Sequence, residues 1–147
     1  MPVVLVPDAT LSTEVARGLL PDVVPHADAA FNAGRSALLV HALTSGGLLM
    51  EATEDRLHQR QRATAMPASL AVIERLRAAG HAAVVSGAGP SVLVLARRTV
   101  RSADQPPGAE ELRDVTASVP EGWSVLPLDV DPTGARVSRG TAQVSSR

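Results

Sequence analysis

The 147-residue chain lacks several residue types, and each absence excludes a kind of chemistry. Without cysteine it forms no disulfide bonds and offers no thiolate to a metal, and without lysine it has no Schiff-base or lysine-base mechanism. With no tyrosine, one phenylalanine and one tryptophan, it has no platform of aromatic rings on which bases or sugars could stack. No apolar run approaches the ~20 residues of a membrane-spanning helix, and Met1-Pro2 does not open a signal peptide.

What the chain does contain is typical of one globular domain. Apolar residues make up 45% of it, and the net charge of −1 favours neither nucleic acid nor an anionic membrane as a partner. We therefore expect one cytoplasmic domain that binds neither. All 14 basic residues are arginine, whose planar guanidinium grips carboxylate and phosphate groups bidentately. A GC-rich genome explains the same bias without any function.

The stretch Ser86-Gly87-Ala88-Gly89-Pro90-Ser91 separates two short apolar runs, 82–85 and 92–96. Both runs are rich in β-branched residues, which predicts two buried strands joined by a turn. The glycines allow positive φ and leave backbone N–H groups open to an anion. No Gly-Lys-Ser/Thr follows, which excludes a Walker loop, and a strand follows where a dinucleotide-binding site needs a helix. From these residues alone, a tight turn is a better interpretation than an anion site.

Periodicity and capping signals predict an α+β domain, with helices packed on an antiparallel sheet built from residues 81–86, 91–97 and 123–130. The predicted helices are Thr13–Leu20, Pro25–Thr44, Leu48–Leu57, Ala68–Ala79 and Gly108–Ser118, and residues 3–6 are a further predicted strand. In the last strand, Trp123, Val125 and Leu128 are expected to point inward. Residues 101–107 have the composition of a linker, and we expect a disordered tail, 138–147, after a domain that spans 1–137.

The first predicted helix carries a candidate anion grip. Thr13 and Arg17 are four residues apart and share one helix face, with Ser12 as a good N-cap before them. A hydroxyl at a helix N-terminus and a guanidinium one turn later can together bind an anion. An exposed cap and a solvated arginine explain the same spacing more simply, so both interpretations stay open.

The second predicted helix carries a polar stripe and a histidine. Asp28, Asn32 and Arg35 share one face, which favours a packing or subunit surface over ligand contact. His41 lies nine residues after Asn32, so a straight helix points it to the opposite side. A satisfied, partly buried histidine is more common at such a position than a ligand-binding one.

Several motifs together resemble the homoserine kinases, which belong to the superfamily of galactokinase, homoserine kinase, mevalonate kinase and phosphomevalonate kinase. The stretch 86–91 is similar to the third motif of that superfamily. The resemblance to homoserine kinases is carried by Val-Pro-Asp-Ala-Thr-Leu-Ser-Thr-Glu-Val-Ala-Arg (6–17), Phe-Asn-Ala-Gly-Arg (31–35) and Glu-Asp-Arg-Leu-His-Gln (54–59), with Arg62 close behind. It runs from about Val3 to Val137 and covers only the C-terminal half of such an enzyme.

The resemblance implies a ferredoxin-like α+β fold and assigns residues 3–6 to the preceding half of the enzyme. It implies Thr13 near the reacting hydroxyl, with Arg17 and Arg62 on the substrate carboxylate. His41 matches a position where some homoserine kinases carry a histidine. The resemblance also implies that the phosphate-binding loop of the other half is supported, and is given one N–H donor, by the stretch that contains Ser86, Gly87, Ala88, Gly89 and Ser91. Without the resemblance, the connector around Arg62 would be interpreted as a solvated basic loop.

The implied reaction transfers the γ-phosphoryl group of ATP to the side-chain hydroxyl of L-homoserine with Mg²⁺, in threonine biosynthesis. The resemblance places the nucleotide loop and the Mg²⁺-binding acids in the N-terminal half, and no stretch here is similar to them. We therefore expect no metal site and no activity of the chain alone, while a homodimer stays open. The alternative is a non-catalytic ferredoxin-like module that binds an amino acid or pairs subunits. A Gly-Leu-Gly-Ser-Ser-type loop encoded in frame upstream would distinguish the two.

Overall fold

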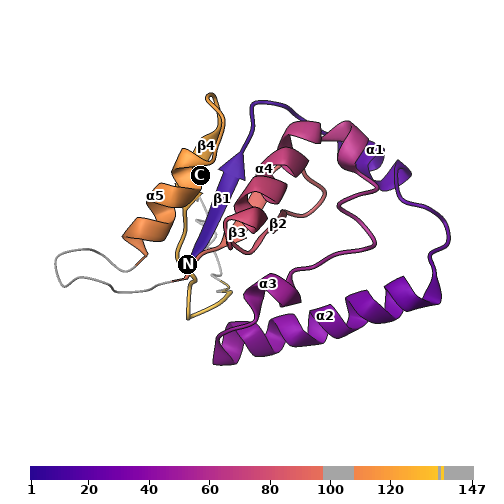
Figure 1. Ribbon diagram of the computed structural model, residues 1–147, viewed down its shortest axis with the longest axis horizontal. Coiled ribbons are helices and arrows are strands. Elements are labelled where there is room, and N and C mark those ends of the chain that lie inside the picture. Colours follow the sequence, from indigo (N-terminus) through magenta and orange to yellow (C-terminus); the bar gives the residue numbers. More distant parts are fainter. Residues whose placement is uncertain (98–107, 136, 138–147) are drawn as a thin grey trace, which may run out of the picture.

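The computed structural model describes residues 1–97, 108–135 and 137, so the predicted linker 101–107 and tail 138–147 lie outside the described residues. The helices are α1 (Thr13–Gly18), α2 (His26–Ser45), α3 (Leu49–Ala52), the 3-10 turn η1 (Ala63–Ala65), α4 (Pro67–Ala78) and α5 (Ala109–Ala117). The strands are β1 (Pro2–Val6), β2 (Ala83–Val85), β3 (Val92–Leu95) and β4 (Ser124–Pro127). Figure 1 shows α4 and α5 beside the sheet, with α2 set apart along one edge of the molecule. No helix in these ranges is both long and apolar enough to cross a membrane.

The four strands form one antiparallel sheet in the order β2-β3-β1-β4, which confirms the predicted α+β class. β1 is an inner strand, because Val3 pairs with Val94 of β3 on one side and with Pro127 of β4 on the other. The expectation that residues 3–6 belong to a preceding half is therefore wrong. The physical reason is burial, since Val3 and Leu5 are fully buried in the core that the other strands share.

Helices α4 and α5 supply the helical side of the hydrophobic core. In α4, Val72, Ile73 and Leu76 recur at helical spacing and are buried against the sheet together with Val115 of α5. Pro67 stands at the start of α4, where its missing N–H and fixed φ cost nothing. The core thus fixes the position of α4, from which the site described below is supported.

The strand β4 confirms two of the three inward residues predicted for it. Trp123 and Val125 pack against the core. Leu128 lies beyond the end of β4 and is 46% exposed, so its predicted inward orientation is wrong. Leu128 is three positions after Val125, so the alternation of a strand puts these two side chains on opposite faces.

The helix predicted over 48–57 ends at Ala52 because side chains compete for its backbone. The carboxylate of Asp55 accepts hydrogen bonds from the N–H groups of residues 57–59, which a continuing helix would have used. Arg77 of α4 donates to the carbonyl oxygen of Met50 at 2.7 Å and to the hydroxyl of Thr53 at 2.9 Å. The chain therefore leaves the helix and enters an irregular segment, residues 54–62, called the connector below.

Candidate functional site

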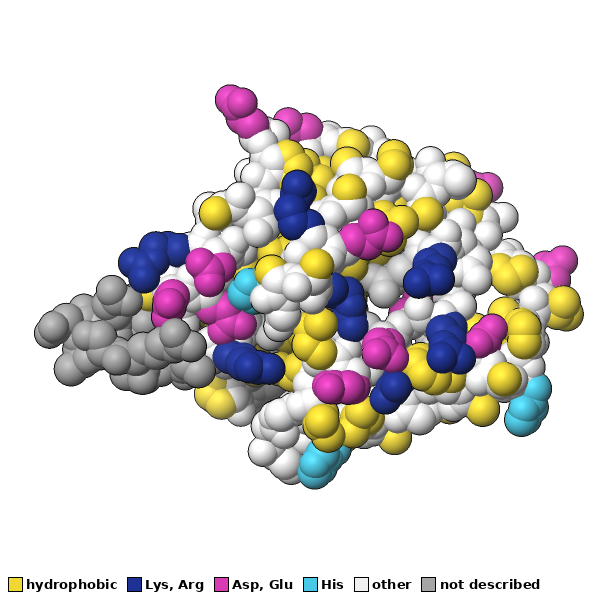
Figure 2. Space-filling model, viewed as in Figure 1, with side chains coloured by type: hydrophobic (Ala, Val, Ile, Leu, Met, Phe, Trp, Pro, Cys, Tyr) yellow, Lys and Arg dark blue, Asp and Glu magenta, His cyan; other side chains and the backbone are white. Residues whose placement is uncertain are grey.

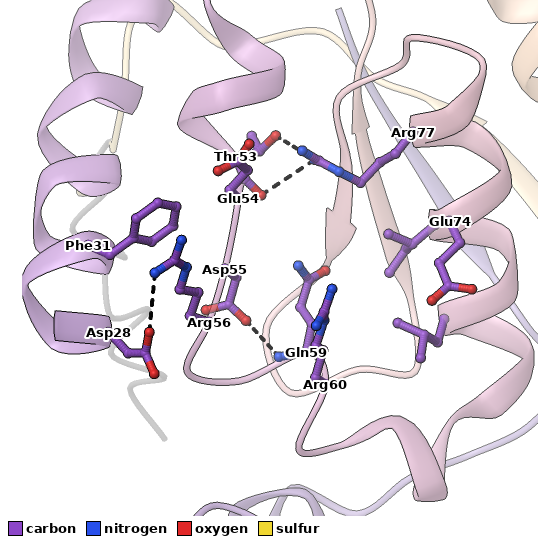
Figure 3. A pocket seen from close by; sticks show the side chains of 12 residues that line it. Asp28, Phe31, Thr53, Glu54, Asp55, Arg56, Gln59, Arg60, Glu74 and Arg77 are labelled. Atoms are coloured by element: carbon purple, nitrogen blue, oxygen red, sulfur yellow. Dashed lines mark hydrogen bonds and ion pairs between the residues drawn. The ribbon is translucent and has the colours of Figure 1, made fainter. Parts of the chain in front are cut away.

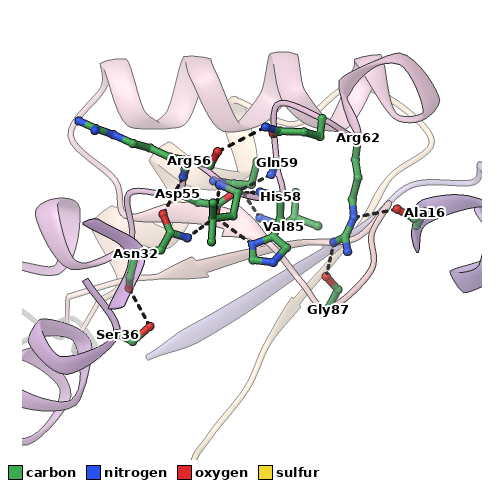
Figure 4. A network of polar contacts seen from close by, with 12 residues as sticks. Ala16, Asn32, Ser36, Asp55, Arg56, His58, Gln59, Arg62, Val85 and Gly87 are labelled. Carbon is green, nitrogen blue, oxygen red and sulfur yellow. Dashed lines mark hydrogen bonds and ion pairs between the residues drawn. The ribbon is translucent and has the colours of Figure 1, made fainter. Parts of the chain in front are cut away.

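Arg62 links parts of the chain that are far apart in the sequence. The residue is buried, with 8% of its surface exposed. Its Nε donates a hydrogen bond to the carbonyl oxygen of Ala16 in α1 at 3.1 Å, and its Nη1 donates to that of Gly87 at 3.2 Å. Figure 4 shows the guanidinium between these two carbonyl groups. A guanidinium carries five N–H donors, so two hydrogen bonds leave donors for a ligand.

Residues 86–91, called the glycine turn below, join β2 to β3. The Ser86 N–H donates to the Ser91 carbonyl oxygen at 2.8 Å and closes the turn. Gly87 and Gly89 have φ values of +61° and +86°, in the region that favours glycine. From α4, the buried hydroxyl of Ser69 donates to the carbonyl oxygen of the turn's proline at 2.5 Å. The turn is therefore held from inside the core as well as by its own backbone.

A cavity of about 340 Å³ opens beside Arg62 and Gly87. Its wall is completed by residues of the connector and of β2, namely Asp55, His58, Gln59, Val84 and Val85. The cavity brings one predicted substrate-binding residue and one residue of the glycine turn together with a histidine and a carboxylate. Its volume lies in the range of small-ligand sites.

Asp55 organises the connector. Its carboxylate accepts hydrogen bonds from the N–H groups of His58 at 2.9 Å and Gln59 at 2.6 Å, and from the side-chain amide of Asn32 in α2 at 2.7 Å. Burial alone would raise the pKa of Asp55, but hydrogen bonds from Gln59, Asn32 and His58 favour the charged form and lower that pKa to about 2. The carboxylate is therefore ionised at neutral pH, and it fixes the loop that leads to Arg62.

The polar stripe of α2 packs on the connector. The Asn32 side-chain oxygen accepts a hydrogen bond from the Arg56 N–H at 3.0 Å. Asp28 lies 3.3 Å from the guanidinium of Arg56, and Arg35 pairs with Glu54 at 3.1 Å. The interpretation of the stripe as a packing surface is confirmed, since its three members hold the connector against the helix.

Of the predicted site residues, only Arg62 and Gly87 line the cavity, so the other residues of the glycine turn and three residues elsewhere do not. Thr13 is the first residue of α1 and Arg17 follows one turn later; both are exposed, and neither lines the cavity. Arg17 nevertheless directly follows Ala16, whose carbonyl group binds Arg62. His41 is exposed, on the side of α2 opposite Asn32, where the helical phase puts it.

A larger cavity, of about 730 Å³, separates α2 from α4 and contains none of the predicted site residues. Figure 3 shows charged side chains on its walls. Several are already paired: Arg56 is hydrogen-bonded to Asp28 and stacks on Phe31, 3.7 Å from the ring centroid, while Arg77 is bonded to Thr53. These charges hold the parts of the chain to one another. We therefore place the candidate site at the smaller cavity.

Sequence reasoning missed the roles of Asp55, His58 and Gln59. All three stand in a motif that carries the family resemblance, but no role was attached to them. Aspartate side chains often accept hydrogen bonds from backbone N–H groups a few residues later, and this tendency could have identified Asp55 as a residue that interrupts the helix predicted over 48–57. The positions of His58 and Gln59 in the cavity wall depend on how the connector packs against β2, which no local pattern reveals.

Comparison with known families identifies the class of protein that has this fold and site. A family model described as "GHMP kinases C terminal" matches residues 29–117, which is more than half of the chain. The chain therefore belongs to the GHMP kinases C terminal family. The match runs from α2 through the connector and the glycine turn to α5.

Relatives within this class carry a more particular name. A homoserine kinase from Streptomyces avermitilis is 55% identical over 138 residues, which are 93% of this chain and 42% of the relative. One from Clavibacter michiganensis is 52% identical over 137 residues, covering 92% of this chain and 42% of the relative. A crystal structure of homoserine kinase from Cytophaga hutchinsonii has the same fold, with a TM-score of 0.66 at 18% identity, over 86% of this chain and 41% of that one. The chain thus spans 42% of the length of these two curated relatives.

Proposed function

We propose that this chain is the substrate-binding C-terminal part of a homoserine kinase, which phosphorylates L-homoserine with ATP in cytoplasmic threonine biosynthesis. The observation that carries the proposal is the position of Arg62. Its guanidinium joins α1, next to Arg17, to the glycine turn, and it lines the cavity beside that turn. Two stretches that resemble homoserine kinases in sequence, and the glycine turn that resembles the superfamily motif, therefore meet at one side chain, as a shared binding site requires.

Arg62 and Arg17 bind the α-carboxylate of homoserine in this proposal. Two backbone acceptors hold Arg62 in place, so its remaining donors are oriented before the substrate arrives. Arg17 is exposed and completes the clamp from α1, and Thr13 of the same helix contacts the reacting hydroxyl. Phosphoryl transfer depends chiefly on positioning and charge neutralisation, and good positioning contributes several kcal/mol.

The glycine turn supports the phosphate-binding loop of the N-terminal part of the kinase. Within the described ranges, the N–H groups of Gly87 and Ala88 donate to no acceptor, so they are open to a phosphate oxygen. The same ranges contain no group of three or more acidic or histidine side chains placed to hold a metal. We therefore assign Mg²⁺ and most of the ATP site to the part of the kinase that this chain does not span, and we route no step through the metal.

A fusion protein tests the proposal. The chain is joined to the part of the Streptomyces avermitilis enzyme that it does not match, and ADP release is followed with ATP, Mg²⁺ and homoserine. We expect homoserine-dependent turnover at a rate ordinary for a kinase, about 1 s⁻¹ or more. The 147-residue chain alone is expected to show none, and turnover by the chain alone would refute the assignment of the nucleotide site.

The non-catalytic module is the rival outcome of the same experiment. It predicts a folded fusion protein without kinase activity, together with binding of homoserine by the 147-residue chain alone in calorimetry.

A further inference from the structure

His58 is held at one nitrogen of its imidazole ring and is open at the other. Its Nδ1 lies 3.0 Å from an oxygen of the Asp55 carboxylate, and 49% of its side chain is exposed. Within the ranges that the structure describes, its Nε2 has no hydrogen-bond partner. Figure 4 shows the ring beside Asp55, and the same residue lines the cavity together with Arg62. The roles proposed so far for this cavity leave the nitrogen unused.

The neighbouring carboxylate decides which ring nitrogen of His58 carries the hydrogen. Because the ionised Asp55 can only accept hydrogen bonds, their contact places the hydrogen of the neutral imidazole on Nδ1. Asp55 is itself fixed by the side-chain amide of Asn32 at 2.7 Å and by the N–H of Gln59 at 2.6 Å. Nε2 therefore carries the lone pair, and His58 offers the cavity an acceptor that is oriented before a ligand arrives.

Groups that prefer opposite charges thus lie on one cavity wall. Arg62 has donors left for an anion, whereas His58 is an acceptor with the negative charge of Asp55 behind it. Figure 2 shows basic and acidic side chains interspersed between α2 and α4, where the connector runs, so no single sign of charge dominates this part of the surface. A small ligand that carries both a carboxylate and an ammonium group fits this arrangement better than a purely anionic one.

We propose that Nε2 of His58 binds the α-ammonium group of the amino-acid substrate and that Asp55 positions the ring, an inference that rests on the proposed function. The α-ammonium and α-carboxylate groups are bonded to the same carbon atom, so a carboxylate held by Arg62 keeps the ammonium group in the same cavity. The reacting hydroxyl of homoserine is two carbon atoms further along and is assigned to Thr13, which does not line the cavity. The ammonium group is therefore the donor that faces Nε2.

This contact makes His58 a residue that determines specificity. A hydroxy acid without the amino group leaves Nε2 without a donor, and a site built to pair with a polar group of its substrate discriminates against the analogue that lacks the group. The probe is γ-hydroxybutyrate, which keeps the carboxylate and the hydroxyl of homoserine and lacks only the amino group. Its binding to the fusion protein is measured by calorimetry and by inhibition of homoserine turnover, beside the binding of L-homoserine.

Two substitutions separate the ring nitrogens of His58. His58→Asn keeps an amide donor near Nδ1 for Asp55 and removes Nε2, whereas the matched control His58→Gln carries an amide oxygen close to the position of Nε2. We expect His58→Asn to weaken L-homoserine by about ten- to a hundred-fold and to leave γ-hydroxybutyrate and the melting temperature unchanged. His58→Gln should lose less, and Arg62→Ala should weaken both compounds, since both carry the carboxylate.

The same measurements distinguish failure of this inference from failure of the proposed function. Equal weakening of the two compounds by His58→Asn would overturn the inference, because a structural role affects both alike, and so would unchanged binding of L-homoserine. In either case an active fusion protein retains the proposed function. A folded, unmodified fusion protein that neither binds nor phosphorylates L-homoserine would refute the proposed function and this inference with it.

NMR of the histidine ring nitrogens tests the tautomer in the 147-residue chain, whether or not the fusion protein folds. The chain contains four histidines, and the signals of His58 are those missing from the spectrum of His58→Asn. At neutral pH we expect the hydrogen on Nδ1, and a larger shift of the Nε2 signal with L-homoserine than with γ-hydroxybutyrate. A hydrogen on Nε2, or equal shifts with the two compounds, would overturn the inference.

Discussion

Gln59 occupies the place of a strand partner for Val85. The side-chain oxygen of Gln59 accepts a hydrogen bond from the Val85 N–H at 2.8 Å, at the outer edge of the sheet, where β2 has no neighbouring strand. The contact ties the connector to the last residue of β2, directly before the glycine turn. One amide group thus sets the distance between the two segments that form the candidate cavity.

Removing the side-chain amide of Gln59 is expected to lower the stability of the protein measurably, although the group is small. Gln59→Ala leaves the Val85 N–H without its acceptor, and we expect the free energy of unfolding to fall by about 1 kcal/mol. Gln59→Glu keeps an oxygen at the same position and should lose less. Urea unfolding of the two variants measures the difference, and equal losses would show that the hydrogen bond contributes nothing.

The alanine variants of the two arginines in the proposed clamp should differ in thermal stability, but both should lose affinity for homoserine more than for ATP. In the fusion protein, Arg17→Ala and Arg62→Ala are each expected to weaken homoserine by about ten- to a hundred-fold, with ATP affected less. Arg62→Ala should also lower the melting temperature, because it leaves the carbonyl groups of Ala16 and Gly87 unpaired. Arg17 is exposed, so its loss should leave the melting temperature unchanged.

Steady-state kinetics with each substrate varied in turn, together with thermal melting, separates these effects. Arg62→Lys should also bind homoserine more weakly than the unmodified protein, because an ammonium group cannot reproduce the planar guanidinium fork. His41→Ala serves as the control and should do less than either arginine variant, since its side chain faces away from the connector. Normal homoserine KM and kcat in both arginine variants, with loss of activity in His41→Ala, would show that the roles are assigned to the wrong residues.

The ionised state of Asp55 should make stability depend on pH in the acid range. Its pKa is lowered from 3.8 to about 2 in the folded chain, so its contribution is fully present above pH ~4 and is lost as the pH falls toward 2. This shift in pKa corresponds to about 2 kcal/mol in the free energy of unfolding. Asp55→Asn should remove most of this at pH 7 and much less at pH 2 to 3, as measured by urea unfolding of the 147-residue chain. A pH-independent difference between the two proteins would contradict this origin.

The two glycines of the glycine turn should tolerate alanine differently. A Cβ on Gly89 would lie 2.6 Å from the sulfur of Met66, which is buried, whereas a Cβ on Gly87 meets nothing within 4 Å. Both have positive φ, so Gly87→Ala should cost about 1 kcal/mol from backbone strain. Gly89→Ala should cost about 1–3 kcal/mol more, from overpacking.

Thermal melting of the 147-residue chain compares these variants with Gly34→Ala. Gly34 lies inside α2 in open space, so alanine there should be neutral or stabilise by up to about 1 kcal/mol. Equal melting of Gly87→Ala and Gly89→Ala would mean that Met66 moves aside without cost.

The parts of the fold that depend on local chemistry could be predicted from the sequence. The helix α4 begins at Pro67 and ends before Gly80, whose φ is +91°, and both signals are readable without any tertiary contact. The glycine turn and its flanking strands could be predicted in the same way. The early end of α3 was not, because it depends on Arg77, a side chain that arrives from another helix.

The candidate site was predictable as a set of residues but not as an arrangement. A guanidinium on a basic loop can be solvated, can bind a ligand or can support the backbone, and its sequence context is the same in each case. That Arg62 supports both α1 and the glycine turn follows from contacts across 46 and 25 positions of the chain. The place of β1 in the sheet is likewise set by long-range pairing, which a periodicity of two cannot specify.

The position of β1 has a consequence for how the protein is made. β1 is an inner strand, yet it leaves the ribosome long before either neighbour, since Val3 pairs with Val94 and Pro127. During synthesis the apolar edges of β1 stay unpaired while the intervening helices emerge, and β4, which begins at Ser124, is the last strand of the sheet to be made. Such non-local pairing slows folding and exposes the nascent strand to aggregation. Ribosome-bound chains that stop before Ser124 should therefore depend on chaperones that shield β1.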